Sequence, residues 1–238
     1  MPTARKTSPP PSVTRDNIGA VTDALILDFD GTILDTETPQ YRAWCEAYLA
    51  HGVEGPDIEL WRGNIGLDPA SERFDPRRHL STLVDRVDPE IAGTRRRRRT
   101  SELIGAEAPR AGIVAWLAFA RQRGLAVGVA SSSPLDWVEE HLDRLDLGVE
   151  FEVVACAGDG LRGKPAPDVY LHACVRLGVE PGRSVAVEDS PPGVRAARAA
   201  GLRCVAVPNP VTAGMEFPGA DVVVDSLADL DPTGHLGT

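Results

Sequence analysis

Two aspartates, Asp28 and Asp30, end an apolar segment of this sequence, and Gly31 follows them, where the chain can turn sharply. Residues two apart in a strand point to the same side, so we expect the two carboxylates side by side. Neighbouring carboxylates repel each other unless a cation neutralises them, and such oxygen ligands favour a hard divalent metal, usually Mg²⁺. The pair therefore predicts a metal site, although taken alone it could also cap a helix or form a turn.

Polar groups of complementary type follow three further apolar segments. They are a run of serines (131–133), a lysine in a proline-rich loop (163–168) and a second acidic pair (188–189). We interpret Ser133 as the cap of the next helix and Lys164 as a point-charge contact to phosphate and carboxylate groups. Lys164 is notable because only two of the 25 cationic side chains are lysines. Four complementary groups at successive strand ends indicate one site.

The apolar segments that precede these groups have the length and composition of buried strands. We expect strands at 24–29, 125–130, 153–156, 184–187 and 204–207, and helices at 113–123, 135–145, 167–177 and 193–200. Strand and helix alternate, which predicts an α/β fold: a Rossmann-like parallel sheet flanked by helices. In such a sheet, ligands bind at the carboxyl ends of the strands.

The alternation breaks once, after the first strand. We expect residues 38–108 to form an inserted helical domain, with the core made of 21–37 and 109–238 and a disordered leader at 1–20. The insertion contains five consecutive arginines, 95–99. We interpret them as the solvated face of a helix, with phosphate steering as the alternative.

Composition limits the classes of partner. The chain has 238 residues, 42% of them hydrophobic, and a formal net charge of -10. This balance disfavours nucleic acid and membrane surfaces as partners, and no segment is long and apolar enough to span a bilayer. Four separated cysteines predict neither a zinc site nor a disulfide framework. We expect a cytoplasmic protein with reduced thiols, a monomer or a homodimer, that binds a small metabolite.

Four motifs of this sequence resemble those of the haloacid dehalogenase superfamily. They read DFDGT, ASSS, KPAPD and VEDSPPG, and the helical insertion after the first resembles the C1 cap of that superfamily. The likeness covers about residues 21–230. It is strongest to the branch that contains β-phosphoglucomutase and many sugar-phosphate phosphatases. The resemblance implies an enzyme that transfers phosphoryl groups with Mg²⁺.

The resemblance also implies a role for each motif residue. Asp28 would attack phosphorus to give an aspartyl-phosphate, and Asp30 would act as general acid and then as general base. The phosphoryl oxygens would be held by Ser131, Ser132 and Lys164, and the metal by Asp28, the backbone carbonyl of Asp30, Glu188 and Asp189. In the cap, the candidates for substrate contact are Glu37, Gln40 and Asn64.

The activity expected is a phosphatase of a sugar or polyol phosphate. Dehalogenases of this superfamily do not need the second aspartate, and a phosphonatase would need a cap lysine, which this sequence lacks. A phosphomutase is the alternative, but Gln40 stands where its cap histidine would be, and the loop 63–66 has no arginine. A catalytically inactive binding module is the further alternative, and the complete motif set argues against it.

Overall fold

The computed structural model describes residues 21–66, 74–158 and 160–236. The leader predicted at 1–20 lies outside the described residues, as does most of the loop between Gly66 and Phe74. Within the described ranges, no helix has the length and apolarity needed to cross a membrane. All four cysteines are free thiols, and Cys174 and Cys204 are buried.

A six-stranded parallel sheet with the strand order β3-β2-β1-β4-β5-β6 forms the centre of the fold. The strands are β1 (Ala24–Leu27), β2 (Ala126–Ser131), β3 (Val153–Cys156), β4 (Ser184–Glu188), β5 (Arg203–Ala206) and β6 (Val222–Val223). Central strand β1 pairs with both neighbours, since Ala24 lies opposite Ala126 of β2 and Ser184 of β4. Strands β2 and β3 lie on one side of β1, and β4, β5 and β6 lie on the other. This change of direction places a crevice at the carboxyl ends of β1 and β4. The predicted α/β fold is confirmed.

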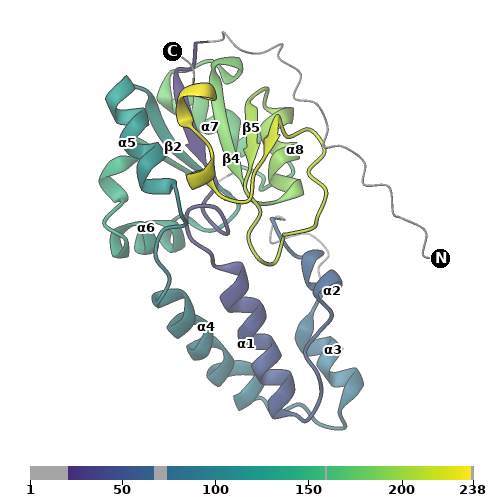
Figure 1. The fold of residues 1–238 in the computed structure, drawn as a ribbon. Helices are drawn as coiled ribbons and strands as arrows, with labels where there is room; N and C mark the ends of the chain where they lie inside the picture. Colours follow the sequence, from purple (N-terminus) through teal and green to yellow (C-terminus); the bar gives the residue numbers. More distant parts are fainter. Residues whose placement is uncertain (1–20, 67–73, 159, 237–238) are drawn as a thin grey trace, which may run out of the picture.

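Helices cover both faces of the sheet (Figure 1). They are α5 (Ile113–Arg123), α6 (Leu135–Arg144), α7 (Asp168–Leu177) and α8 (Pro191–Ala199). Alternate residues of β1 point to opposite faces. Leu25 and Leu27 pack in the core that includes Trp116 of α5. Ile26 packs in the other core with Tyr170 of α7. Burial on both faces explains why the strands are continuous apolar runs.

A second group of helices lies beyond the carboxyl-terminal edge of the sheet, in the lower part of Figure 1. These helices are α1 (Glu37–Ala50), α2 (Ile58–Arg62), α3 (Pro76–Leu83), the π-helix η1 (Glu90–Arg95) and α4 (Arg96–Gly105). We call them the helical unit. Its own small core contains Tyr48, Leu80 and Ala92. A further cluster joins the unit to the sheet side, because Trp61 and Ile65 pack against Val211.

Short 3₁₀ helices complete the described chain. They are η2 (Gly148–Glu150), η3 (Pro181–Arg183), η4 (Leu227–Asp229) and η5 (Pro232–Gly234). Leu227 of η4 is buried, and its carbonyl accepts a hydrogen bond from the Trp116 indole at 3.2 Å. The C-terminal segment is thereby tied to α5.

Candidate active site

The predicted motif residues come together at the carboxyl-terminal edge of the sheet, because all strands run in the same direction. A pocket of about 730 Å³ lies between this edge and the helical unit. From the sheet side it is lined by Asp28, Asp30, Ser131, Ser132, Lys164 and Asp189. Its size is within the range of small-molecule sites, about 300–1,000 Å³. Glu188 lies behind this lining and is fully buried.

Lys164 forms the electrostatic centre of the site. Its side chain is buried, and Nζ makes ion pairs with an Asp28 carboxylate oxygen and, at 2.7 Å, with Oε1 of Glu188. Tyr170 donates a hydrogen bond of 2.6 Å to the same Glu188 oxygen. Burial alone would lower the pKa of Lys164, but Asp28 and Glu188 outweigh it and raise the pKa. The ammonium therefore stays charged and orients Asp28.

Asp28, Glu188 and Asp189 form a buried acidic cluster whose ligand oxygens all lie within 4.8 Å of one another. Burial raises the pKa of Asp28 to about 7 although Lys164 opposes the shift. Burial, followed by repulsion from Asp28 and Glu188, raises the pKa of Asp189 well above its usual value. One ammonium cannot neutralise three carboxylates, and oxygen-only donors suit a hard divalent cation. The cluster therefore has the chemistry of a Mg²⁺ site.

The Asp30 side chain is outside that cluster and is held by three donors. Thr36 Oγ1 and Trp137 Nε1 donate to Oδ1 at 2.8 and 3.0 Å, and Ser133 Oγ donates to Oδ2 at 2.6 Å. The prediction that Ser133 caps α6 is wrong, since the residue before this helix is Pro134 and no side chain caps it. Three hydrogen bonds fix the Asp30 carboxyl group in one orientation.

The serines after β2 organise the loops around Lys164. Ser131 Oγ accepts a hydrogen bond of 3.0 Å from the backbone N–H of Ser133. Ser132 Oγ accepts one of 3.0 Å from the backbone N–H of Lys164. Ser131 is buried and lines the pocket beside Asp28. Its hydroxyl hydrogen has no acceptor among the hydrogen bonds of the described residues, which leaves a donor for a bound anion.

The turn after Asp30 requires glycine. Gly31 has a φ of +84°, and a Cβ there would collide with the carboxylate of Asp189. Arg110 donates hydrogen bonds to the carbonyls of Gly31 at 2.5 Å, Val207 at 2.8 Å and Pro208 at 2.7 Å. These bonds hold the loops after β1 and β5 together. Arg110 was not predicted, because its role depends on residues far from it in the sequence.

Asp189 has a second fixed partner from the loop after β5. Asn209 Nδ2 donates a hydrogen bond of 2.6 Å to Asp189 Oδ2. The Asn209 side-chain oxygen, Oδ1, in turn accepts from the backbone N–H groups of Val211 and Thr212 at 2.8 and 3.0 Å. Because the amide is held at both ends, it sets the orientation of the Asp189 carboxylate.

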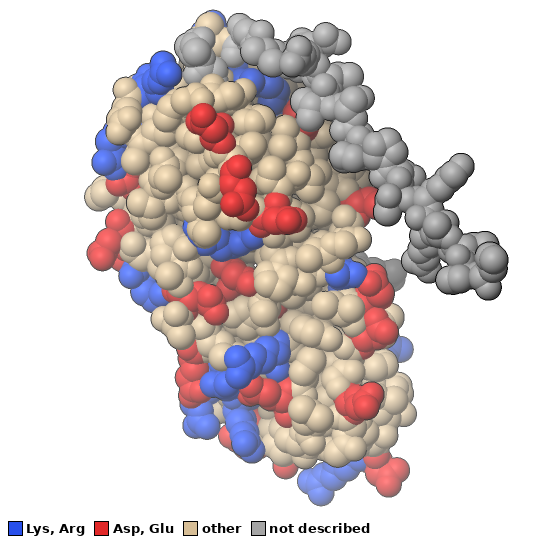
Figure 2. Space-filling model, viewed as in Figure 1, with Lys and Arg blue, Asp and Glu red and all other residues tan. Residues whose placement is uncertain are grey.

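The helical unit supplies the opposite wall of the pocket. It contributes the three predicted candidates Glu37, Gln40 and Asn64, together with Trp44, Trp61, Gly66, Arg96, Thr100 and Ile104. Asn64 donates a hydrogen bond of 3.0 Å to the carbonyl of Phe74. The interpretation of residues 95–99 as a solvated face holds for Arg95, Arg97 and Arg98 but is wrong for Arg96, which is half-buried in this wall. Figure 2 shows basic side chains gathered on the lower half of the molecule, and Arg95, Arg98 and Arg99 line a groove between α1 and α4.

Comparisons with known proteins agree with this geometry. A family model described as haloacid dehalogenase-like hydrolase matches residues 22–201. The chain is 39% identical over 209 residues to YhcW of Bacillus subtilis (strain 168), a protein named as a phosphatase. The match covers 87% of this chain and 93% of the relative. It is 32% identical to hexitol phosphatase B of Escherichia coli (strain K12), covering 90% and 96% of the two chains.

A solved structure shares both the fold and part of the sequence. CbbY from Rhodobacter sphaeroides, in complex with xylulose-(1,5)bisphosphate, aligns with a TM-score of 0.64 and 32% identity. The alignment covers 88% of this chain and 96% of the other. Sheet and helical unit are therefore both within the region of similarity.

Proposed function

This chain belongs to the haloacid dehalogenase-like hydrolase family, and we propose that it is a Mg²⁺-dependent phosphatase that hydrolyses a small sugar or polyol phosphate through an aspartyl-phosphate on Asp28. The observation that carries the proposal is the buried pairing of Asp28 with Lys164 beside an Asp30 held by three donors. A nucleophile and a general acid therefore lie two residues apart and face the same pocket.

In the first step, a carboxylate oxygen of Asp28 forms a bond to phosphorus, and the bond from phosphorus to the leaving oxygen breaks. Asp30 gives its proton to that oxygen, so the product leaves as a neutral alcohol. In the second step, Asp30 takes a proton from a water molecule whose oxygen attacks phosphorus, which releases phosphate and restores Asp28. Lys164 and the Ser131 hydroxyl hold the phosphoryl oxygens throughout. Splitting one difficult displacement into two lowers the barrier of each.

The acidic cluster fits a divalent cation on charge, donor type and burial. Asp28 and Asp189 would hold it, with the backbone carbonyl of Asp30. Glu188, whose oxygens contact Lys164, Tyr170 and Ser190, would support the site from behind. A bound Mg²⁺ supplies positive charge that stabilises the negative charge on the transferring phosphoryl group.

We further propose that the helical unit, with the boundaries 38–108 expected from the sequence, acts as a cap. Gly66 of the unit lies so close to the sheet side that a Cβ there would collide with the Ser190 hydroxyl. The pocket between the two parts would be shielded from bulk water during the reaction, which favours charge-assisted contacts to the phosphoryl group. The residues that line the unit's wall would select the substrate.

The pocket also supports hydrolysis over a mutase reaction. Gln40, which replaces the expected histidine of a mutase, lines the pocket, and so does Asn64 of the loop without an arginine. Neither side chain supplies the histidine or arginine contact expected of a mutase in this branch. The hexitol phosphatase and CbbY relatives support a phosphorylated sugar or polyol as the substrate.

The test is phosphate release from a panel of sugar, polyol and nucleotide monophosphates with Mg²⁺. We expect release from sugar or polyol phosphates that is lost in Asp28→Asn and after addition of a chelator. Conversion of β-glucose 1-phosphate to glucose 6-phosphate without release would instead establish the mutase. Absence of both reactions, with retained binding of a phosphorylated ligand, would establish a binding module.

A further inference from the structure

Helix α4 turns one face toward the catalytic pocket. Arg96, Thr100 and Ile104 all line it, and they are spaced i, i+4 and i+8, which places them on one side of a helix. Arg95, Arg98 and Arg99 line a separate groove of about 330 Å³ on the outside, between α1 and α4, and Arg96 borders both cavities. The run of arginines is therefore divided between two surfaces by the helical period, and only Arg96 reaches the catalytic pocket.

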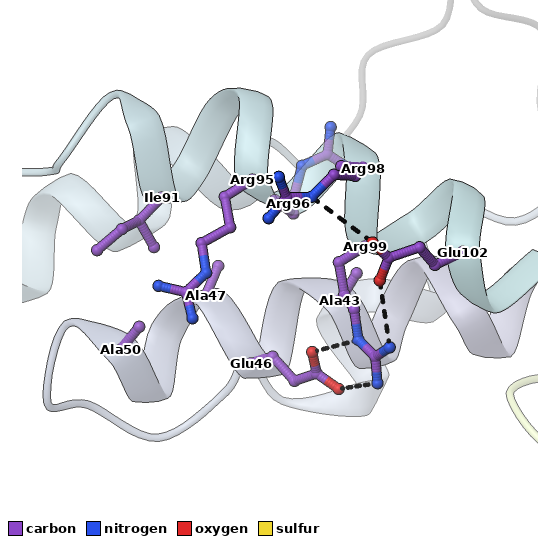
Figure 3. A pocket seen from close by; sticks show the side chains of 10 residues that line it. All are labelled: Ala43, Glu46, Ala47, Ala50, Ile91, Arg95, Arg96, Arg98, Arg99 and Glu102. Atoms are coloured by element: carbon purple, nitrogen blue, oxygen red, sulfur yellow. Dashed lines mark hydrogen bonds and ion pairs between the residues drawn. The ribbon is translucent and has the colours of Figure 1, made fainter.

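Two arginines of the outer groove, Arg98 and Arg99, have carboxylate partners. Figure 3 shows Arg99 in contact with Glu46 of α1 and Arg98 in contact with Glu102, at 2.8 and 3.6 Å. Among the described residues, no ion pair involves Arg96. Its guanidinium makes one long hydrogen bond, 3.4 Å, to the Thr100 hydroxyl.

The guanidinium of Arg96 is held over the face of Trp44, with its central carbon 4.8 Å from the ring centroid. Trp44 lines the catalytic pocket and not the outer groove, so the guanidinium of Arg96, which borders both cavities, lies against a residue of the catalytic pocket. Stacking engages the face of the guanidinium and leaves the N–H donors at its edge for a ligand. The Nε atom is buried and has no hydrogen-bond partner among the described residues.

A half-buried cation without a carboxylate partner has an energetic cost in the free protein. Burial lowers the pKa of Arg96, and repulsion from Arg97 adds to the effect. Polar groups in such surroundings are normally paired, so the unpaired Nε–H of Arg96 is open to a bound partner. Because an arginine fork matches phosphate and carboxylate oxygens, the missing partner is expected to be an anion.

The rest of the pocket points to the same conclusion. Lys164 is the other cation among the described lining residues, and it already contacts two carboxylates. The loop 63–66 on the same wall contains no cation. Arg96 is thus the described lining cation whose charge is available to a part of the substrate that does not react.

We propose that Arg96 binds a second anionic group of the substrate, so that the preferred substrate is a sugar or polyol with another phosphate or a carboxylate besides the phosphoryl group that is transferred. This inference rests on the proposed function for the identity of the reacting group. Hydrogen bonds to charged groups contribute enough for about a 10- to 100-fold difference in affinity.

The test measures binding in an Asp28→Asn background, where no turnover is required. Calorimetry compares xylulose 1,5-bisphosphate with xylulose 5-phosphate, and 6-phosphogluconate with glucitol 6-phosphate. We expect the member with the second anionic group to bind about 10- to 100-fold tighter in at least one pair, and Arg96→Gln to remove that preference. The first pair reports a second phosphate and the second pair a carboxylate.

Arg97→Gln is the matched control, because Arg97 is exposed and lines neither cavity. It should keep the preference intact. The inference is overturned if neither pair shows a preference, or if Arg96→Gln weakens both members of each pair equally, which would indicate a packing role against Trp44. Loss of phosphate release with a retained Arg96-dependent preference would refute only the proposed hydrolysis.

Discussion

Replacing Lys164 with methionine removes the ammonium from the catalytic cluster and keeps an unbranched apolar side chain in its place. Lys164 is 1% exposed and contacts both Asp28 and Glu188. The variant therefore leaves two carboxylates buried without their shared cation. We expect it to abolish phosphate release and, independently, to destabilise the fold.

The structure gives the size of the stability effect. At 2.7 Å and an effective dielectric constant of about 20, the Lys164–Glu188 attraction amounts to roughly 6 kcal/mol, part of which offsets desolvation. Removal of one partner from a buried pair costs about 3–5 kcal/mol. Asp28 can take up a proton because its pKa is already raised to about 7. At pH 6 we therefore expect the lower end of that range.

The unfolding free energy lost in Lys164→Met should grow with pH, and the direction of this change follows from the raised pKa of Asp28. Its pKa is raised by burial, so its contribution to stability is present at low pH and is lost as pH rises toward the folded-state pKa. In the wild-type protein without metal this loss is complete near pH 7. Lys164 lowers the pKa of Asp28, so the variant without it has a higher folded-state pKa at Asp28. The variant therefore continues to lose stability above pH 7. Between pH 6 and 8 the difference in unfolding free energy between the wild-type protein and Lys164→Met should increase by about 1 kcal/mol.

The assay is urea unfolding of both proteins at pH 6 and pH 8, with a chelator present. Arg183→Met is the control, because Arg183 pairs with Asp23 on the surface at 2.6 Å. That variant should lose less than about 1 kcal/mol, with no change between the two pH values. A Lys164→Met effect below about 1 kcal/mol, or one that shrinks as pH rises, would refute this reasoning about the cluster.

Two further substitutions test the walls of the pocket. Trp137→Phe removes the 3.0 Å hydrogen bond to Asp30 but keeps a ring, so kcat should fall about 3- to 10-fold with KM nearly unchanged in steady-state kinetics. An unchanged kcat would show that the other two donors suffice. Gly66→Ala places a methyl group against the Ser190 hydroxyl at a φ of +69°, so we expect kcat/KM to fall about tenfold while the melting temperature drops by only a few degrees. Unchanged kinetics would show that cap contact at this point is dispensable.

The strands that carry the site could be predicted because they are buried on both faces. An apolar run such as 24–27 or 184–187 needs no knowledge of its partners to be identified. Strand β6 has only two residues, Val222 and Val223, and gives no such signal. In the helical unit, residues 38–108 were expected to be helical as a whole, but the short helices α2 and α3 depend on packing around Trp61 and Leu80.

The same distinction applies to the active site. Asp28, Lys164 and Asp189 follow strands or short loops, so their convergence follows from a parallel sheet. Trp137 and Asn209 reach the site only through tertiary packing, and neither lies in a motif with a chemical signature. A sequence pattern reports which residues leave a strand end, and it does not report which distant donors meet them there.

Arg96 could have been separated from its neighbours by the helical period. Thr100 and Ile104 follow Arg96 at i+4 and i+8, so the three residues lie on the same side of the helix and line the pocket. Arg97 and Arg98 lie on other sides of the helix. Five consecutive arginines do not show which side of the helix is buried, because each of them is equally compatible with exposure to solvent. The decisive information is which side of α4 packs on α1, and that is a property of the folded chain.

The covalent role of Asp28 is tested most directly by trapping the intermediate. The protein is mixed with Mg²⁺ and a phosphorylated sugar that it hydrolyses, quenched in acid within one turnover, and digested for mass spectrometry. We predict one added phosphoryl group on the peptide that contains residues 24–31, located at Asp28 and absent from Asp28→Asn and from a chelator-treated sample. Full release of phosphate during a single turnover, with no phosphoryl group on Asp28 at any quench time, would contradict the account.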